Sequence, residues 1–423
     1  MLALRAVRPA HLALALATLA FAANFSVWVL YAVLALQLQD SLGLSATGLG
    51  LLFATPMVSG ALLRIPAGVL CDRGDPRPMF AAQMLVVVPA LLLLSRADSL
   101  GEYLLLGLWI GVSGTSFTFG ISYVVSWFER NHQGTAMGIF GVGNAGAAIT
   151  LALTPAIVEH WGWAAVGPAY GLGLLAVALL FITLAPVSPP GTSAPVPERG
   201  GRPVLMRLRI WRFGLYYYFV FGSFLALLLW LPQYYVNVYG FSSHKAMAYT
   251  LVFAVSSSMV RALGGWFADR YGGRAVNWSV FWICLVCLFF LSYPPTTMTI
   301  HGVHSDVHIN IRIDALVFTL LITVIGIAQG FGRASVYKII HDYYPRHMGT
   351  VGGFVAALGA LGGATLPIAF GVAVDLLGIY SACFMLLYGV LALCMIVMFF
   401  ANKTDRFRDR LREASQHNFL DLD

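Results

Sequence analysis

The sequence predicts an all-α membrane protein with twelve transmembrane helices in two six-helix halves. Hydrophobic residues form 59% of the 423 residues and charged residues only 10%, whereas soluble domains are typically about 25% charged. Apolar runs recur along the chain, and each is close to the roughly 20 residues that a helix needs to cross about 30 Å of hydrocarbon. A polar central stretch and a motif repeated in each half divide these runs six and six.

The predicted helices follow the apolar runs in chain order. The first run follows Arg5 and Arg8 but is too long for the core of a signal peptide, so we expect it to be the first membrane helix. The twelve predicted spans are 11–37, 46–71, 78–97, 102–127, 134–158, 163–187, 210–238, 244–267, 277–293, 313–340, 348–374 and 379–401.

The most polar internal stretch runs from Ala185 to Arg209 and is rich in Pro, Gly and Arg. This composition is typical of a linker between packed units. The predicted organisation is therefore an N-terminal bundle 1–187, a cytoplasmic linker 188–209, a C-terminal bundle 210–401 and a cytoplasmic tail 402–423.

The net charge of +7 would suit a nucleic-acid partner, but its distribution indicates membrane topology instead. Most of the 25 Lys and Arg residues fall at the N-terminus, in turns on the same side of the membrane and in the C-terminal tail; only Arg96, Lys245 and Arg312 fall on the opposite side. This positive-inside asymmetry predicts a multi-pass protein of the plasma (inner) membrane with both termini in the cytoplasm. We expect the lipid bilayer, and no nucleic acid, as its surroundings.

The two halves share an internal repeat. "LRIPAGVLCDRGDPR" and "VRALGGWFADRYGGR" both contain R-x3-G-x3-D-R, which starts at Arg64 in one half and at Arg261 in the other. "GTAMGIFGVGNAG" from Gly134 and "GTVGGFVAALGALGG" from Gly349 both begin G-T-x-x-G and continue rich in glycine. Two related halves are the plan of secondary transporters, which hold their substrate near mid-membrane between the halves.

Arg64 and Arg261 hold equivalent positions within predicted helices. An arginine at a helix centre costs roughly 2.5–3.5 kcal/mol on insertion scales, and it cannot lose its charge because its pKa is above about 12. No Asp or Glu lies near the middle of a predicted span, so the missing partner is predicted to be the substrate, a small anion. In the alternative, each arginine bonds to backbone carbonyls or extends outward toward its end of the helix.

The turns after the second and eighth helices, "GVLCDRGDPRP" and "GWFADRYGGRA", resemble the cytoplasmic-loop motif of the major facilitator superfamily. The resemblance implies the major facilitator fold and a conformational latch formed by Asp72, Arg73, Asp269 and Arg270. The alternative is a solvated charged turn without a latching role.

The glycine-rich segments allow close helix packing, and they also resemble the two nitrate signatures of the nitrate/nitrite porter family. "ALLRIPAG", "FVFGSF" and "ASVYKII" are similar to further segments of that family. The signature glycines are Gly138, Gly141, Gly143, Gly146, Gly353, Gly359, Gly362 and Gly363.

Carried over by position, the resemblance implies that two arginines clamp the anion, one amide donates a hydrogen bond to it, and three aromatic rings wall the site. These residues are Arg64 and Arg261, Asn144, and Phe117, Tyr217 and Phe221. A guanidinium fork suits planar nitrate or bent nitrite better than a point charge does. Apolar walls suit a weakly hydrated anion and disfavour phosphate or sulfate, whose lost hydration needs more donors.

The expected function is alternating-access transport of nitrate, nitrite or both, as an exchanger, by a monomer. Proton symport stays open as an alternative, with Arg333 and Lys338 as the candidates for a coupling role. Two further alternatives are an exchanger of small organic anions such as formate or oxalate, and a membrane receptor that senses nitrate without moving it.

No nucleophile elbow, phosphate loop or catalytic carboxylate pair is visible, so the sequence predicts that the protein is not an enzyme. Cys284 and Cys287 form a C-x-x-C within an apolar run, and we expect them to pack rather than bind metal. His301, His304, Asp306 and His308 have metal-like spacing but are expected in a solvated loop. We therefore expect neither a metal nor a cofactor.

Overall fold

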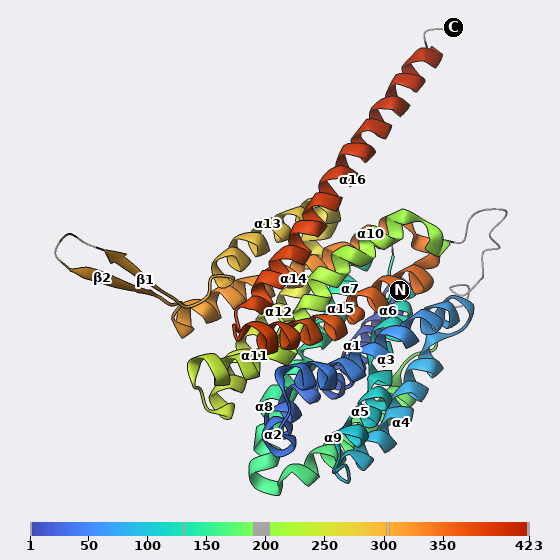
Figure 1. Cartoon of the computed structure of the whole chain (residues 1–423). Coiled ribbons are helices and arrows are strands. Elements are labelled where there is room, and N and C mark those ends of the chain that lie inside the picture. Colours follow the sequence, from blue (N-terminus) through green and yellow to red (C-terminus); the bar gives the residue numbers. More distant parts are fainter. Residues whose placement is uncertain (1, 130–131, 189–203, 302, 304, 421–423) are drawn as a thin grey trace.

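The computed structural model describes residues 2–129, 132–188, 204–301, 303 and 305–420, and these form a bundle of long helices (Figure 1). Helices of the first half, blue to green, and of the second half, yellow-green to red, gather on two sides of the bundle (Figure 1). Within the described part of the chain, twelve helical spans are long and apolar enough to cross a membrane. The predicted fold of twelve helices is therefore confirmed, with span ends within about one helical turn of the prediction.

The first half contains six spans, of which the first, fourth and fifth are interrupted. Its elements are α1 (Leu2–Trp28), α2 (Tyr31–Leu42), α3 (Ala46–Arg73), α4 (Pro76–Leu94), α5 (Leu100–Ile110), η1 (Gly111–Thr115), α6 (Ser116–Val125), α7 (Gln133–Gly141), η2 (Val142–Ala145), α8 (Gly146–Trp161), η3 (Trp163–Ala165) and α9 (Val166–Leu184).

The second half has the same number of spans. Its elements are η4 (Val204–Met206), α10 (Leu208–Tyr217), η5 (Tyr218–Ser223), α11 (Phe224–Tyr239), α12 (Ser243–Tyr271), α13 (Gly273–Leu291), β1 (Thr296–His301), β2 (Asp306–Ile311), α14 (Ala315–Tyr343), η6 (Pro345–His347), α15 (Met348–Leu377) and α16 (Ala382–Leu420). The predicted linker falls mostly on 189–203, outside the described residues. The predicted tail continues α16 as a helix through Leu420.

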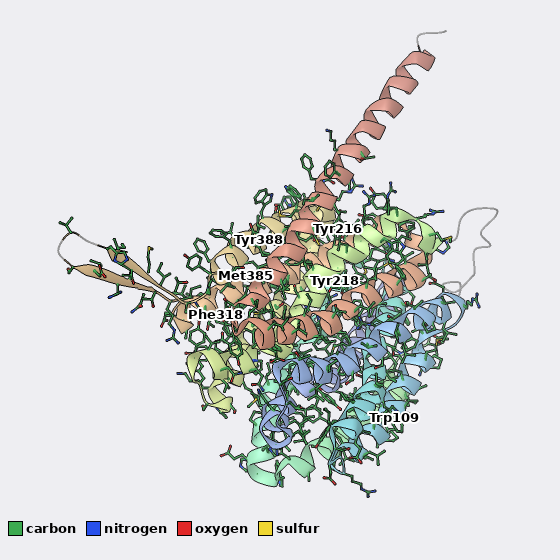
Figure 2. All side chains as sticks on the ribbon, in the orientation of Figure 1. Trp109, Tyr216, Tyr218, Phe318, Met385 and Tyr388 are labelled. Atoms are coloured by element: carbon green, nitrogen blue, oxygen red, sulfur yellow. The ribbon has the colours of Figure 1, made fainter. Side chains whose placement is uncertain are left out.

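Apolar side chains cover the outer surface as well as the interior (Figure 2). Trp109 and Met385, labelled there, are 39% and 47% exposed. A soluble protein would hide most such side chains, whereas lipid tails solvate them. The exposed apolar surface therefore fits a membrane environment.

Several membrane helices change geometry near their middle. The first span breaks between Trp28 and Tyr31, η1 and η2 are 3₁₀ segments, and η5 is a π-helical segment. Glycines at 111, 114 and 143 weaken the α-helix at two of these points. Such irregular turns often mark functional sites, and all four lie next to the arginine cluster described below.

The predicted solvated loop between the ninth and tenth membrane helices is instead a β-hairpin, so this prediction was wrong in form. Strands β1 and β2 pair antiparallel, with Met298 opposite Ile309, and they project away from the helices (Figure 1). Alternating β-branched and polar residues in "TTMTIH" and "DVHINI" carried this signal. His301 Nδ1 lies 3.0 Å from Asp306 Oδ1, while His304 is outside the described residues. Among the residues described, no group of three potential metal ligands forms.

Two helix pairs join the halves through close backbone contact. Helix α3 packs along α15, where a Cβ at Gly50 would lie 2.5 Å from the Pro367 carbonyl oxygen. Helix α12 packs against the fifth span, where a Cβ at Gly138 would lie 2.9 Å from the Arg261 carbonyl oxygen. These two pairs carry Arg64 and Arg261, so the repeat places both arginines where the halves meet.

We expect Gly143→Leu and Gly146→Leu each to impair folding, because both glycines face α1. A Cβ at Gly143 would lie 2.5 Å from Phe21 Cδ1, and one at Gly146 would overlap the Ala22 carbonyl oxygen. Forcing extra atoms into such a contact typically costs about 1–3 kcal/mol and occasionally more. The measurement is the yield of monodisperse purified protein and its melting temperature.

Gly173→Leu is the matched control for these variants. A Cβ at Gly173, within α9, meets no described atom within 4 Å, so a leucine there fits without strain. If all three variants gave the yield and melting temperature of the parent protein, the contact with α1 would not need glycine.

Candidate functional site

Three arginines from three helices are buried in the middle of the bundle. Arg64 of α3 and Arg333 of α14 are 0% exposed, and Arg261 of α12 is 1% exposed. The charge of Arg261 lies close enough to repel those of both Arg64 and Arg333. Among the side chains that the structure describes, no aspartate or glutamate is buried with them. The cluster therefore carries positive charge that protein carboxylates do not balance.

Arg64 joins the two halves. Its Nε donates to the Gly114 carbonyl oxygen (2.8 Å) and its Nη1 to the Ala356 carbonyl oxygen on α15 (2.9 Å). Its guanidinium lies over the rings of Trp28 (4.7 Å) and Phe221 (5.4 Å). Within the described residues, Nη2 has no hydrogen-bond partner. The backbone contacts considered at the outset thus form in part, but neutral carbonyls leave one donor and the net charge uncompensated.

Arg261 is held against the fifth span. Its guanidinium lies 5.1 Å from the centre of the Phe117 ring, and Nη1 lies 3.5 Å from the Gly141 carbonyl oxygen. Nε has no hydrogen-bond partner among the residues described. Arg261 therefore resembles Arg64 in having an aromatic neighbour, a carbonyl contact in the opposite half and an unused donor.

Asn144 connects Arg261 to Arg333. With its amide oriented so that the oxygen faces the arginines, that oxygen accepts from Arg261 Nη1 (2.9 Å) and Arg333 Nη1 (2.7 Å). The orientation of an amide is assigned from its hydrogen bonds, and this one satisfies both donors. The structure thus gives Asn144 an acceptor role toward two cations, while its predicted donation to the anion stays a prediction.

Arg333 belongs to this cluster, although the sequence suggested it only as a coupling residue. Its Nη2 donates to the backbone oxygen (2.7 Å) and to Oγ (2.6 Å) of Ser257, and its guanidinium lies 3.9 Å from the centre of the Phe224 ring. Arg333 was missed as a site residue because neither the repeat nor the family resemblance predicts an arginine there. Its place in an apolar run was the signal available.

The predicted aromatic walls form a continuous chain of rings between Arg64 and Arg261. Phe221, next to Arg64, stacks on Tyr217 (5.1 Å between centroids), Tyr217 contacts Tyr337 (5.1 Å), and Tyr337 contacts Phe117 beside Arg261 (5.1 Å). The Tyr217 hydroxyl has no hydrogen-bond partner within the described chain. All six predicted substrate residues are therefore buried in one region.

Two aromatic residues of this region were not predicted. Tyr337 closes the chain of rings and donates to the Gly352 carbonyl oxygen (2.9 Å), and Trp28 lies under Arg64 at the break of the first span. Tyr337 follows Arg333 by four residues, so both lie on one face of α14. That spacing could have identified Tyr337, whereas Trp28 had no comparable signal.

Several signature glycines lie against the predicted site residues. A Cβ at Gly141 would lie 2.6 Å from Arg261 Cζ, one at Gly353 would lie 2.8 Å from the Arg64 carbonyl oxygen, and one at Gly359 would overlap the Tyr217 ring. Gly362 and Gly363 bring α15 against the seventh span at Gly222 and Leu225. These glycines therefore shape the site and permit close helix contact.

The acid of each repeated turn contacts the opposite half. Asp72, at the end of α3, accepts from the backbone N–H groups of Gly349 (3.0 Å) and Thr350 (2.8 Å) in the first turn of α15, and from the Thr350 hydroxyl. Asp269 of α12 accepts from the backbone N–H (3.0 Å) and hydroxyl (3.1 Å) of Thr135 in α7. Each carboxylate thus binds the start of a signature helix.

The arginines of these turns lie differently from the acids. Arg73 and Arg270 are exposed, and Arg270 lies over the rings of Trp266 (5.6 Å) and Tyr271 (5.8 Å). The contacts between halves come from the acids, so a latching role for the arginines stays a prediction.

Lys338, the second coupling candidate, lies at this end of the bundle rather than in the arginine cluster. Its Nζ is 3.3 Å from Asp269 Oδ1 and 3.1 Å from Asp342 Oδ1. The hydrogen-bond geometry to Asp269 Oδ1 is poor, so this contact is an ion pair by proximity.

A third carboxylate joins the halves at the opposite end of the bundle. Asp375 of α15 accepts from the backbone N–H groups of Ala46 (3.2 Å) and Thr47 (2.9 Å) and from the Thr47 hydroxyl (2.6 Å), at the start of α3. Helices α3 and α15 are therefore joined at both ends, and the arginine cluster lies between the two contacts.

The sequence matches the family model of the Major Facilitator Superfamily over residues 16–307 and 311–421. The solved structure of the human organic anion transporter MFSD10 has a similar fold, with a TM-score of 0.71 and 16% sequence identity over 92% of this chain and 99% of that one. The chain belongs to the Major Facilitator Superfamily, and it is a transporter rather than an enzyme.

Relatives within the superfamily are more specific. A Thermus thermophilus protein named "Probable nitrate/nitrite antiporter NarK1" is 35% identical over 90% of this chain and 89% of its own length. A Mycobacterium tuberculosis protein named "Probable nitrate/nitrite transporter NarK2" is 31% identical over 86% of this chain and 89% of its own length. Within the superfamily, this chain is a member of the nitrate/nitrite porter family.

Proposed function

We propose that this chain carries nitrate and nitrite across the plasma membrane by alternating access, and that it works as an exchanger. The names of the Thermus and Mycobacterium relatives support the anions, and one of those names specifies antiport. The basic turns that share a side with the termini support a cytoplasmic location for both termini.

The observation that carries the proposal is the set of unused donors beside uncompensated charge. Arg64 Nη2, Arg261 Nε and the Tyr217 hydroxyl are buried without hydrogen-bond partners in the described chain. Buried donors of this kind are costly unless something accepts from them. Nitrate or nitrite between the two arginines would accept these hydrogen bonds, while the rings of Tyr217, Phe221 and Phe117 would replace its weak hydration.

The excess positive charge favours exchange over uncoupled movement. Arg64, Arg261 and Arg333 repel one another most when the halves close around them without an anion, because a low dielectric strengthens the repulsion. A bound anion relieves this repulsion, so closing with an anion is easier than closing without one. Each half of the transport cycle would then need an anion in the site.

Proteoliposomes containing the purified protein test this proposal. We expect labelled nitrate to enter only when nitrite or nitrate is trapped inside, and we expect an imposed pH gradient to have no effect on the rate. Formate, chloride and phosphate serve as trapped control anions. Uptake into vesicles without internal anion substrate, driven by an inward proton gradient, would support nitrate/proton symport in place of exchange.

A further inference from the structure

A groove of about 650 Å³ lies between the start of α10 and the outer part of α16. Arg207, Arg209 and Arg212 line it on one side, and Ile396, Val397 and Phe400 line it on the other. Phe400 is 60% exposed. The groove is far along both helices from the arginine cluster, so it is separate from the proposed transport site.

The groove lies at the edge of the membrane-spanning region. The seventh span begins at Leu208 and the twelfth ends at Thr404, so the groove is on the side of the membrane that carries both termini. Leu208 and Trp211 are 77% and 51% exposed beside the arginines. Exposed tryptophan is typical of the boundary between lipid tails and headgroups.

Aromatic rings hold the basic side chains near the groove. Arg207 lies over the ring of Tyr344 (5.9 Å), and both Arg209 (4.6 Å) and Arg274 (5.2 Å) lie over Tyr343. Among the described residues that line the groove, none is acidic. The groove therefore combines a cationic rim at headgroup depth with an apolar wall that continues toward the hydrocarbon.

We infer that this groove binds an anionic phospholipid such as phosphatidylglycerol. The phosphate would accept hydrogen bonds from Arg207, Arg209 and Arg212, and an acyl chain would cover Ile396 and Phe400. Guanidinium groups bind phosphate through paired hydrogen bonds, and basic pockets between membrane helices bind anionic headgroups. A free phosphate would leave the apolar wall uncovered, so the structure favours a lipid.

The position of the groove gives the lipid a structural effect. Helix α10 carries the three arginines at its start and Tyr217 at its end, where η5 begins. A lipid bound between α10 and α16 would brace the helix that supplies Tyr217 and Phe221 to the proposed anion site. The inference does not depend on which anion is carried.

The test measures which lipid stays bound to the purified full-length protein. The protein is equilibrated in detergent with equal amounts of phosphatidylglycerol and phosphatidylcholine, and bound lipid is quantified by native mass spectrometry. We expect a preference for phosphatidylglycerol that falls roughly a hundredfold in the triple variant Arg207→Gln, Arg209→Gln, Arg212→Gln, since each arginine favours anionic lipid by about fivefold.

A matched control removes the same charge from the other side of the membrane. The triple variant Arg96→Gln, Lys245→Gln, Arg312→Gln is expected to keep the parent preference. Equal preference in the two triple variants would overturn the inference, as would displacement of the lipid by glycerol phosphate. Should the first variant not fold, Arg212→Gln alone is expected to lower the preference about fivefold, and an unchanged preference would have the same adverse meaning.

Discussion

Replacing Arg64 or Arg261 with lysine is expected to lower nitrate uptake roughly a hundredfold, equivalent to about 2.8 kcal/mol. Lysine keeps the charge but offers a point charge on a flexible stem. At Arg64, separate guanidinium nitrogens bind Gly114 and Ala356, and the third, Nη2, has no hydrogen-bond partner among the residues described. A single ammonium group cannot reach both carbonyls and still present a donor in the same direction.

The measurement is the initial rate of nitrate uptake into proteoliposomes loaded with nitrite, at equal amounts of inserted protein. Arg96→Lys is the matched control, because Arg96 is exposed and lies outside the arginine cluster. Its uptake is expected to equal that of the parent protein. Near-normal uptake in the Arg64 or Arg261 variant would remove that arginine from the transport site.

The second large effect is expected for Gly141→Ala, with a loss of uptake of about tenfold or more. An added Cβ would overlap Arg261 Nε and lie 2.6 Å from Cδ and Cζ. The atoms it meets belong to a side chain, so the fold can adjust by moving the guanidinium away from Phe117 and Asn144. Tenfold corresponds to about 1.4 kcal/mol, a modest cost for displacing a buried charged group.

Two measurements separate displacement of Arg261 from loss of folding. The melting temperature of purified Gly141→Ala is expected to stay close to that of the parent protein, while nitrite-driven nitrate uptake falls. Gly173→Ala, where a Cβ meets no described atom within 4 Å, is expected to change neither. Full uptake in Gly141→Ala would mean that Arg261 does not need its present position.

The membrane fold could be predicted because it depends on composition over long windows. A run such as 348–374 contains enough apolar residues to identify a span whatever its neighbours are. The hairpin at Thr296–Ile311 was missed because an exposed two-stranded ribbon has only a short alternating pattern. Hydropathy also carries no information about the π-helical segment at Tyr218–Ser223, which forms where α10 and α15 pack together.

The site could be predicted only where the two halves repeat or the family segments match. Arg64 and Arg261 were found because their spacing to Gly68, Asp72 and the equivalent residues is shared. Arg333 has no repeated counterpart in its helix, so its contact with Asn144 depends on how α14 packs beside the fifth span. A sequence read one helix at a time does not contain that packing.

The three carboxylate contacts between the halves also have a consequence for conformational bias. Asp72, Asp269 and Asp375 each cap the first turn of a helix that belongs to the other half. A side-chain cap of this kind contributes about 1 kcal/mol, or about a fivefold change in an equilibrium. Each cap exists only while its end of the transporter is closed, so these residues set the population of closed and open states without touching the anion. Evolution can thus tune which side of the membrane the empty carrier faces separately from how tightly it binds its substrate.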